Sequence, residues 1–281
     1  MKRVFKGLIM AFGMFTTIPM PKVWDDRGAK YVMTWFPIVG LVIGLIWWVS
    51  AELLVYLQWP SLQNPPFPFF SMPSPMVAGI QLIMCFIFVG LIHLDGFMDT
   101  CDAILSRRSV EDKLRILGDS NVGAFSVIMI VFLLIMQFAA LESIMRGNVS
   151  TFFSISIFQH PFNSMLGLLI VIPIVSRTFS AMAMLCIRPM KADGYVGVFR
   201  PINAMPHRII IPIPALISLF LAWMGVGWVG VVVVLAVAIG YCVSMLIALK
   251  SFEFKGVSGD LAGFSLVISE LCGLFALAIV S

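Results

Sequence analysis

Charged residues are scarce in this chain. Of its 281 residues only 11% are Asp, Glu, Lys or Arg, whereas 60% are hydrophobic. A soluble globular domain carries about 25% charged residues, so this composition excludes an ordinary soluble domain. The formal net charge of +4 is small as well, and it gives no reason to expect a nucleic-acid partner. The composition instead predicts an all-α, polytopic bundle of transmembrane helices embedded in a lipid bilayer.

Cysteine is also used sparingly. No two of the cysteines have the spacing of a metal-binding pair, and most of them stand inside apolar runs. The five positions are Cys85, Cys101, Cys186, Cys242 and Cys272. We therefore expect neither a disulfide framework nor a zinc site.

Long apolar runs predict about seven spans, with six as the alternative, in a single integral membrane domain over residues 1–281. A helix needs about 20 mostly apolar residues to cross a bilayer. Residues 4–20 are apolar but short and broken by Gly13 and Pro19, so we expect an interfacial or re-entrant segment there. The predicted spans lie at about residues 32–57, 76–100, 122–143, 165–187, the two halves of 209–249 and 262–280.

Basic residues alternate between successive loops and so predict the orientation. The N-terminal arm and the loops at 103–118 and 188–208 are rich in Lys and Arg, whereas the loop at 58–75 has none. Basic loops stay on the cytoplasmic side. The N-terminus is therefore predicted to be cytoplasmic, and the polar clusters of the chain then fall on that same side, where one cavity could collect them.

Three carboxylates mark the end of the predicted span at 76–100. Asp95, Asp99 and Asp102 are spaced i, i+4 and i+7, which puts them within roughly 60° of one another on one helix face. Acids so arranged repel each other unless a cation neutralises them, and oxygen ligands suit Mg²⁺ or Mn²⁺. The alternative is a solvated helix end. Gly96 leaves space beside these acids for a ligand or another backbone.

Further polar motifs stand before other apolar runs. Asp119-Ser120 and Ser258-Gly259-Asp260 are either helix N-caps or parts of a metal or phosphate site, and the two roles are compatible. The bases Arg107, Arg108 and Lys113 are either topology signals or phosphate ligands. An oxygen-ligand metal site with bases in a cytoplasmic cavity suits phosphoryl-type transfer, although it names no substrate.

Two charges remain inside predicted spans. Arg177 and Glu270 lie about ten and nine residues from the cytoplasmic ends of their spans, or roughly 13–15 Å deep at 1.5 Å per residue. Because an unpaired charge is costly at that depth, we predict a structural ion pair between them. The alternative is that each side chain has its own polar partner or reaches a water-filled cavity.

Several segments of the sequence resemble those of the cobalamin synthase family, the adenosylcobinamide-GDP ribazoletransferases. Two signature segments carry most of the resemblance, His93–Asp102 and Leu117–Gly123. Further similar segments are Thr17–Pro21, Phe36–Gly40 and Gly256–Asp260, the last followed by Glu270. The chain departs from the family at Asn121, where an Arg is usual, and at Ser258, where a Thr is common.

The resemblance implies a Mg²⁺-dependent transferase in the cell inner membrane with its active site facing the cytoplasm. In the family's reaction α-ribazole, or its 5′-phosphate, takes the phosphocobinamide of adenosylcobinamide-GDP, releasing GMP and forming adenosylcobalamin or its 5′-phosphate. Asp95, Asp99 and Asp102 would hold the Mg²⁺, and Asp119 or Asp260 would accept the hydroxyl proton. Besides the three bases, the implied phosphate contacts are Ser120, Ser258 and Gly259. The oligomeric state stays open, with a homo-oligomer as one alternative.

Two other functions are weighed against this one. A phosphotransferase of the CDP-alcohol type also uses an acidic membrane helix, but its motif has a different order of Asp and Gly. A transporter of a phosphorylated solute would have charges at the membrane midplane, and here only Arg177 and Glu270 meet that condition.

Overall fold

The computed structural model describes residues 2–58, 72–119, 121–151, 164–191, 194–201 and 203–280. Within these ranges the regular elements are helices, apart from one isolated bridge between Pro189 and Val257. The predicted all-α class is therefore confirmed. The helices are α1 (Lys2–Phe15), α2 (Asp26–Ala29), α3 (Val32–Gln58), α4 (Ser74–Ile87), α5 (Ile92–Leu105), α6 (Val110–Ile116), α7 (Ala124–Thr151), η4 (Met165–Gly167), α8 (Leu168–Cys186), α9 (Tyr195–Phe199), α10 (Met205–Ile210), α11 (Ile213–Val226), α12 (Trp228–Ser251) and α13 (Gly259–Val280).

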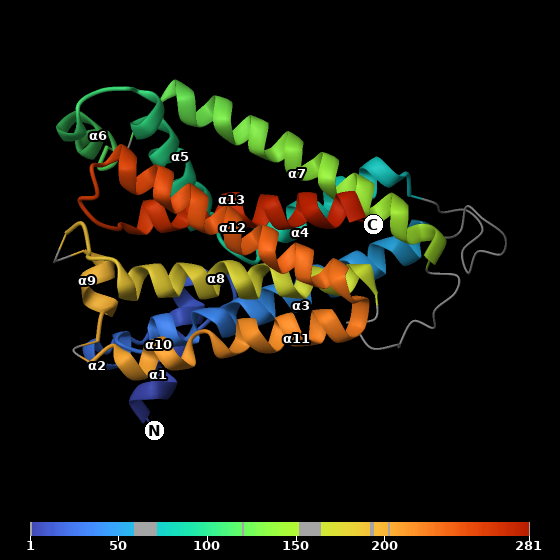
Figure 1. Ribbon diagram of the computed structural model, residues 1–281, viewed down its shortest axis with the longest axis horizontal. Coiled ribbons are helices and arrows are strands. Elements are labelled where there is room, and N and C mark those ends of the chain that lie inside the picture. Colours follow the sequence, from blue (N-terminus) through green and yellow to red (C-terminus); the bar gives the residue numbers. More distant parts are fainter. Residues whose placement is uncertain are drawn as a thin grey trace.

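Six segments of the described chain are long and apolar enough to cross a membrane, and a bent pair of helices raises the number to seven. This agrees with the predicted count. The long helices run side by side along the longest dimension of the molecule, as Figure 1 shows. The six segments are Val32–Val55, Ala124–Gly147, Met165–Cys186, Met205–Val226, Trp228–Ser251 and Gly259–Val280.

The second span is not the continuous helix that the apolar run at 76–100 predicted. It is broken into α4 and α5, which meet at an angle of 93°. Gly90 lies in the break with φ of +67°, a left-handed conformation that favours glycine. Thr17 satisfies two carbonyls there: its Oγ1 donates to Ile87 O at 2.6 Å and its N–H donates to Phe88 O at 3.1 Å. The backbone conformation of Gly90 therefore allows the bend, and the hydrogen bonds from Thr17 stabilise it.

Helix α8 lies at the centre of the bundle. In its apolar window 89% of the residues are buried, against 17% for the window that ends in α11. Helix α3 packs against α8 at two glycines, because a Cβ at Gly40 or Gly44 would overlap the α8 backbone at Pro173 or Ile170. Small residues of this kind allow membrane helices to approach closely, and they fix the position of α8 relative to α3.

The two ends of the bundle differ. Helices α6 and α9 lie at one end, whereas the turn between α11 and α12 lies at the other (Figure 1). The loops that the distribution of bases assigned to the cytoplasm therefore share one end. Helix α5 turns across this same end after the 93° bend, which brings its acidic residues beside the loops.

Helix α1 covers the side of the bundle near that end. Its 14 residues give a length of about 21 Å, which is too short to cross a bilayer. It packs against α3, and its buried face includes Met10 and Phe15. The chain then continues through Asp25, whose carboxylate forms an ion pair with Lys6 at 2.7 Å. This pair joins α1 to the start of α2.

Candidate active site

Helices α5 and α13 cross where α5 carries Gly96. A Cβ on Gly96 would lie 2.8 Å from the Cα of Asp260, and one on Gly263 would lie 3.3 Å from the carbonyl oxygen of His93. The backbones of the two helices are therefore in direct contact. The space that Gly96 was predicted to leave is filled by the backbone of Asp260, and the contact brings acids from two distant parts of the sequence together.

We expect Gly96→Val to disrupt this crossing. The added side chain would overlap backbone, which cannot yield as a flexible side chain can, so α5 and α13 must separate. The rate of product formation should fall about tenfold or more, since displacements of about 1 Å are costly in catalysis. Gly79→Ala is the matched control on α4, because its Cβ would meet only the ring of Phe138 at 3.9 Å. Equal activity of the two variants would contradict the role of the crossing.

The three acids of α5 have three different environments. Asp95 is exposed, Asp99 is partly buried, and Asp102 is buried. The Asp102 carboxylate accepts the N–H of Gly123 at 2.8 Å and the N–H of Ser126 at 3.0 Å. Both N–H groups belong to the start of α7, so Asp102, a residue of α5, caps the N-terminus of α7. The close contact also leaves no room for a Cβ at Gly123.

Asp99 lies within electrostatic reach of three other carboxylates, those of Asp95, Asp102 and Asp260. Of these, Asp102 is already bonded to α7, which leaves Asp95 and Asp260 beside Asp99. Over the residues that the structure describes, no three His, Cys, Asp or Glu side chains are grouped closely enough to hold a metal ion by themselves. The crossing therefore concentrates negative charge without forming a complete metal cage.

Asp260 stands in the first turn of α13. Ser258 caps this helix, since its Oγ accepts the N–H of Leu261 at 3.2 Å, and the same hydroxyl donates to Asp260 Oδ2 at 3.3 Å. Lys191 also acts electrostatically on Asp260. The predicted N-cap is therefore present, and it orients an acid that faces both α5 and a lysine.

Asp119, the other predicted acid, is exposed on the linker between α6 and α7. Its Oδ1 accepts the backbone N–H of Asn121 at 3.0 Å and the Asn121 side-chain amide at 2.7 Å. These hydrogen bonds lower the pKa of Asp119, which makes it a weaker base. Ser120, its neighbour, lies outside the described residues.

The predicted basic residues differ in what they contact. Arg107 and Arg108 are exposed on the turn after α5, and Arg107 has φ of +53°. Lys113 donates from Nζ to the carbonyl oxygen of Ser251 at 3.2 Å, so it ties α6 to the end of α12. These three residues are not among those that line the cavities described next.

A cavity of about 390 Å³, here called the inner cavity, lies on one side of Asp260. It is enclosed by side chains from α1, α3, α5, α8, α9 and α13. Its residues are Met14, Phe15, Phe36, Ile92, His93, Asp95, Ser180, Met184, Phe199, Gly259, Asp260, Ala262 and Gly263. Most of these were missed from sequence, because they come from six elements that only the fold brings together.

Asp260 also lines a smaller space of about 190 Å³, here called the loop pocket, with Lys191, Ser258 and Gly259. The loop pocket shares Leu114, Met190 and Lys191 with a basic groove of about 490 Å³. The other residues of this groove are Arg188, Pro189 and Lys255. None of the bases that line this groove was predicted to be a site residue. The available signal was their place in loops predicted to be cytoplasmic.

Two backbone hydrogen bonds hold the walls of the groove together. The N–H of Met190 donates to Val257 O, and the N–H of Val257 donates to Arg188 O, each at 2.9 Å. Gly256 has φ of +133°, and a Cβ there would lie 2.6 Å from Arg188 O. Only glycine fits this approach, so the loop after α8 is fixed against the loop before α13.

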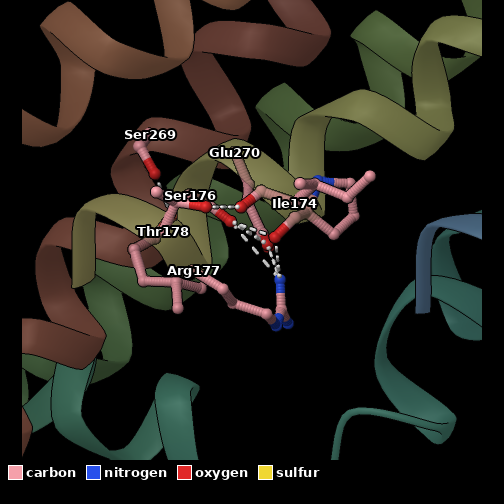
Figure 2. Close-up of polar contacts among 8 residues, drawn as sticks. Ile174, Ser176, Arg177, Thr178, Ser269 and Glu270 are labelled. Carbon is pink, nitrogen blue, oxygen red and sulfur yellow. Dashed lines mark hydrogen bonds and ion pairs between the residues drawn. The ribbon is translucent and has the colours of Figure 1, made fainter. Parts of the chain in front are cut away.

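The predicted pair of intramembrane charges is in contact, as Figure 2 shows. Arg177 Nη1 lies 2.6 Å from Glu270 Oε1, and Ser176 Oγ donates to the same Glu270 oxygen at 2.9 Å. The Arg177 side chain is fully buried, with its guanidinium carbon 5.9 Å from the centre of the Phe36 ring. Among the described residues its Nε and Nη2 have no hydrogen-bond partner. The pair joins α8 to α13 next to Phe36, which lines the inner cavity.

Comparison with known proteins gives consistent matches over the whole chain. A family model described as "Cobalamin-5-phosphate synthase" matches residues 7–278. A relative from Clostridium botulinum (strain Alaska E43 / Type E3), named adenosylcobinamide-GDP ribazoletransferase, is 39% identical over 280 residues, covering 98% of each chain. A relative of the same name from Clostridium perfringens (strain SM101 / Type A) is 35% identical over 286 residues, covering 100% of each. No solved structure matches the chain.

Proposed function

Because this chain belongs to the cobalamin-5-phosphate synthase family, we propose that the crossing of α5 and α13 is the centre at which it acts as an adenosylcobinamide-GDP ribazoletransferase. The family and the names of its relatives indicate a transferase of cobalamin biosynthesis. They favour this activity over a CDP-alcohol-type phosphotransferase and over a transporter. The observation that carries the site assignment is that Asp260 lines both the inner cavity and the loop pocket, so two substrates can meet at it.

We also propose that Asp95, Asp99 and Asp260 hold Mg²⁺ together with the phosphates of the donor. Mg²⁺ in proteins is usually held by one or two carboxylates plus waters and substrate phosphates, not by a complete protein cage. The acids at the crossing fit this donor set, since Asp95, Asp99 and Asp260 lie close enough together to repel one another. When bound, the ion would neutralise the pyrophosphate and stabilise the departing phosphate. Asp102 supports the site by capping α7.

In the proposed reaction the 3′-oxygen of α-ribazole, or of its 5′-phosphate, forms a bond to the phosphorus that carries cobinamide. The bond from that phosphorus to the bridging oxygen breaks, and GMP leaves with the electron pair. Asp260 accepts the proton of the attacking hydroxyl, since it borders both spaces, whereas the carboxylate of Asp119 is held by Asn121. Lys191 and Arg188 face the basic groove, where they would bind the phosphates of the nucleotide.

The direct test of this function uses the purified full chain in lipid vesicles. Supplied with adenosylcobinamide-GDP, α-ribazole and Mg²⁺, it should release GMP and form adenosylcobalamin in equal amounts. Omitting α-ribazole or removing Mg²⁺ with a chelator should stop both products. GMP release that does not depend on α-ribazole, or no release at all, would overturn the proposed transfer.

We further propose that the chain lies in the cell inner membrane with this site at the cytoplasmic face. In a cysteine-free background, Arg108→Cys and Trp228→Cys place single thiols at exposed positions at opposite ends of the bundle. An impermeant maleimide added to intact cells should label Cys at position 228, and should label position 108 only after the membrane is opened. Labelling of position 108 in intact cells would reverse the orientation.

A further inference from the structure

The inner cavity has a mostly apolar, largely aromatic wall and an acidic edge. The ring of Phe15 stacks on that of His93 with centroids 5.8 Å apart and planes 13° apart, and the Phe36 ring lies 5.9 Å from His93. Met184 and Phe199 continue this apolar wall, whereas Asp95 and Asp260 form the polar edge. A ligand that fits must have a flat, apolar body and a polar end.

The volume of the cavity further restricts which part of a substrate can bind in it. Its volume of about 390 Å³ is within the range of about 300–1,000 Å³ found for pockets that bind small molecules. A nucleoside is of this size, whereas a corrin ring with its side chains is several times larger. The corrinoid part of the donor must therefore lie outside the inner cavity.

The guanine of the donor fits this wall poorly. Of the side chains that line the cavity, only those of His93, Ser180 and the two edge carboxylates are polar. Guanine has hydrogen-bonding groups along most of its edge, and leaving them unpaired in an apolar site is costly. A benzimidazole ring has a single free ring nitrogen and otherwise presents carbon and methyl groups.

His93 brings a buried polar atom to the aromatic wall of the cavity. The residue is 8% exposed, and its Nε2 has no hydrogen-bond partner among the described residues. A buried polar atom without a partner is uncommon in a native structure. His93 therefore adds an unpaired polar atom to a mostly apolar wall, but it presents almost no surface of that atom to the cavity.

We propose that the inner cavity binds the benzimidazole base of the acceptor α-ribazole, with the ribose directed toward Asp95 and Asp260. The assignment rests on the proposed function, which names the acceptor, and adds its location. The donor nucleotide then occupies the loop pocket and the basic groove, and both substrates reach Asp260, which lines the inner cavity and the loop pocket. Base selection then depends on side chains of α1, α3, α8 and α9 together with the His93 ring of α5.

The test is to fill the cavity from two different helices. Met14→Trp adds volume from α1 and Ser180→Leu adds it from α8, and both positions line the cavity. Each variant should raise the KM for α-ribazole about tenfold or more, as expected when a pocket loses space for its ligand. The KM for adenosylcobinamide-GDP should change by less than about twofold. Leu8→Trp is the matched control, because Leu8 is a partly buried apolar residue of α1 that does not line the cavity.

The outcomes separate this inference from the function on which it rests. If the wild-type chain releases no GMP, the proposed function fails. If it is active but both filled variants keep the wild-type KM for α-ribazole, the cavity is not the acceptor site. A rise confined to the KM for adenosylcobinamide-GDP would assign the cavity to the donor instead. A rise only for α-ribazole in either variant, with the thermal midpoint of the detergent-purified protein unchanged, supports the proposal.

Discussion

Replacing Asp95 or Asp260 with asparagine is expected to lower the rate of GMP release ~100-fold or more, the loss typical when a group that stabilises transition-state charge is removed. The substitution keeps the size of the side chain but removes the negative charge that would attract Mg²⁺ and, at Asp260, the base. Both residues line the inner cavity, and Asp95 is exposed, so the fold should tolerate the change. Turnover in vesicles and the thermal midpoint of each purified variant are the two measurements.

Asp102 and Asp119 are the informative comparisons. Asp102→Asn should reduce stability as well as activity, because both carboxylate oxygens accept N–H groups at the start of α7 and an amide can accept with only one. Asp119→Asn should leave turnover within about threefold of wild type, since its carboxylate only braces the local turn. Near-normal turnover of Asp260→Asn together with an inactive Asp119→Asn would move the base to the α6–α7 linker.

Glu270→Gln is expected to be the most destabilising single change in the bundle. Removing one partner of a buried ion pair leaves the other charge unpaired, at a cost of about 3–5 kcal/mol. The Arg177 side chain is fully buried, and its Nη1 lies 2.6 Å from Glu270 Oε1. Its Nε and Nη2 have no hydrogen-bond partner among the described residues. The free energy of unfolding in mixed micelles is the quantity to compare. The double variant Arg177→Met, Glu270→Gln should recover more than half of the loss, because no charge is then left in the core.

A matched control for that experiment is present in α7. Arg146 pairs with Glu142 at 2.6 Å, but the Arg146 side chain is 72% exposed, against 18% for Glu142, so the Arg146 charge is not left buried when its partner is neutralised. Glu142→Gln should therefore change the free energy of unfolding little. If the double variant of Arg177 and Glu270 is no more stable than Glu270→Gln alone, the pair is not what determines the loss.

The sequence predicted what depends on local pattern. The lengths of the apolar runs predicted the spans, and the alternation of basic loops predicted which loops share one end of the bundle. The equal depth of Arg177 and Glu270 along their helices predicted the contact between them. The bend at Gly90 was missed, because the apolar run continues through the break and its carbonyls are satisfied by Thr17, far away in sequence. Asp102 likewise lies on the predicted acidic face, yet its tertiary partners are N–H groups of α7.

The residues that line the inner cavity could not be predicted from the sequence for a related reason. A Phe on α1 and another on α3 are indistinguishable from ordinary core residues until the fold brings both against His93. Gly96 was predicted to leave space for a ligand or for another backbone. Its actual neighbour, the backbone of Asp260, is set by the crossing of two helices more than a hundred residues apart.

We propose that acids from α5 and α13 form one cation site, and Mn²⁺ binding is the most direct measurement of such a site. Electron paramagnetic resonance reports free Mn²⁺, which can be titrated with the purified full chain in the presence of adenosylcobinamide-GDP. A protein-free sample subtracts the ion held by the nucleotide alone. We expect saturable Mn²⁺ binding that excess Mg²⁺ abolishes and that the double variant Asp95→Asn, Asp260→Asn lacks. Equal Mn²⁺ uptake by that folded variant and by the wild-type chain would contradict this proposal.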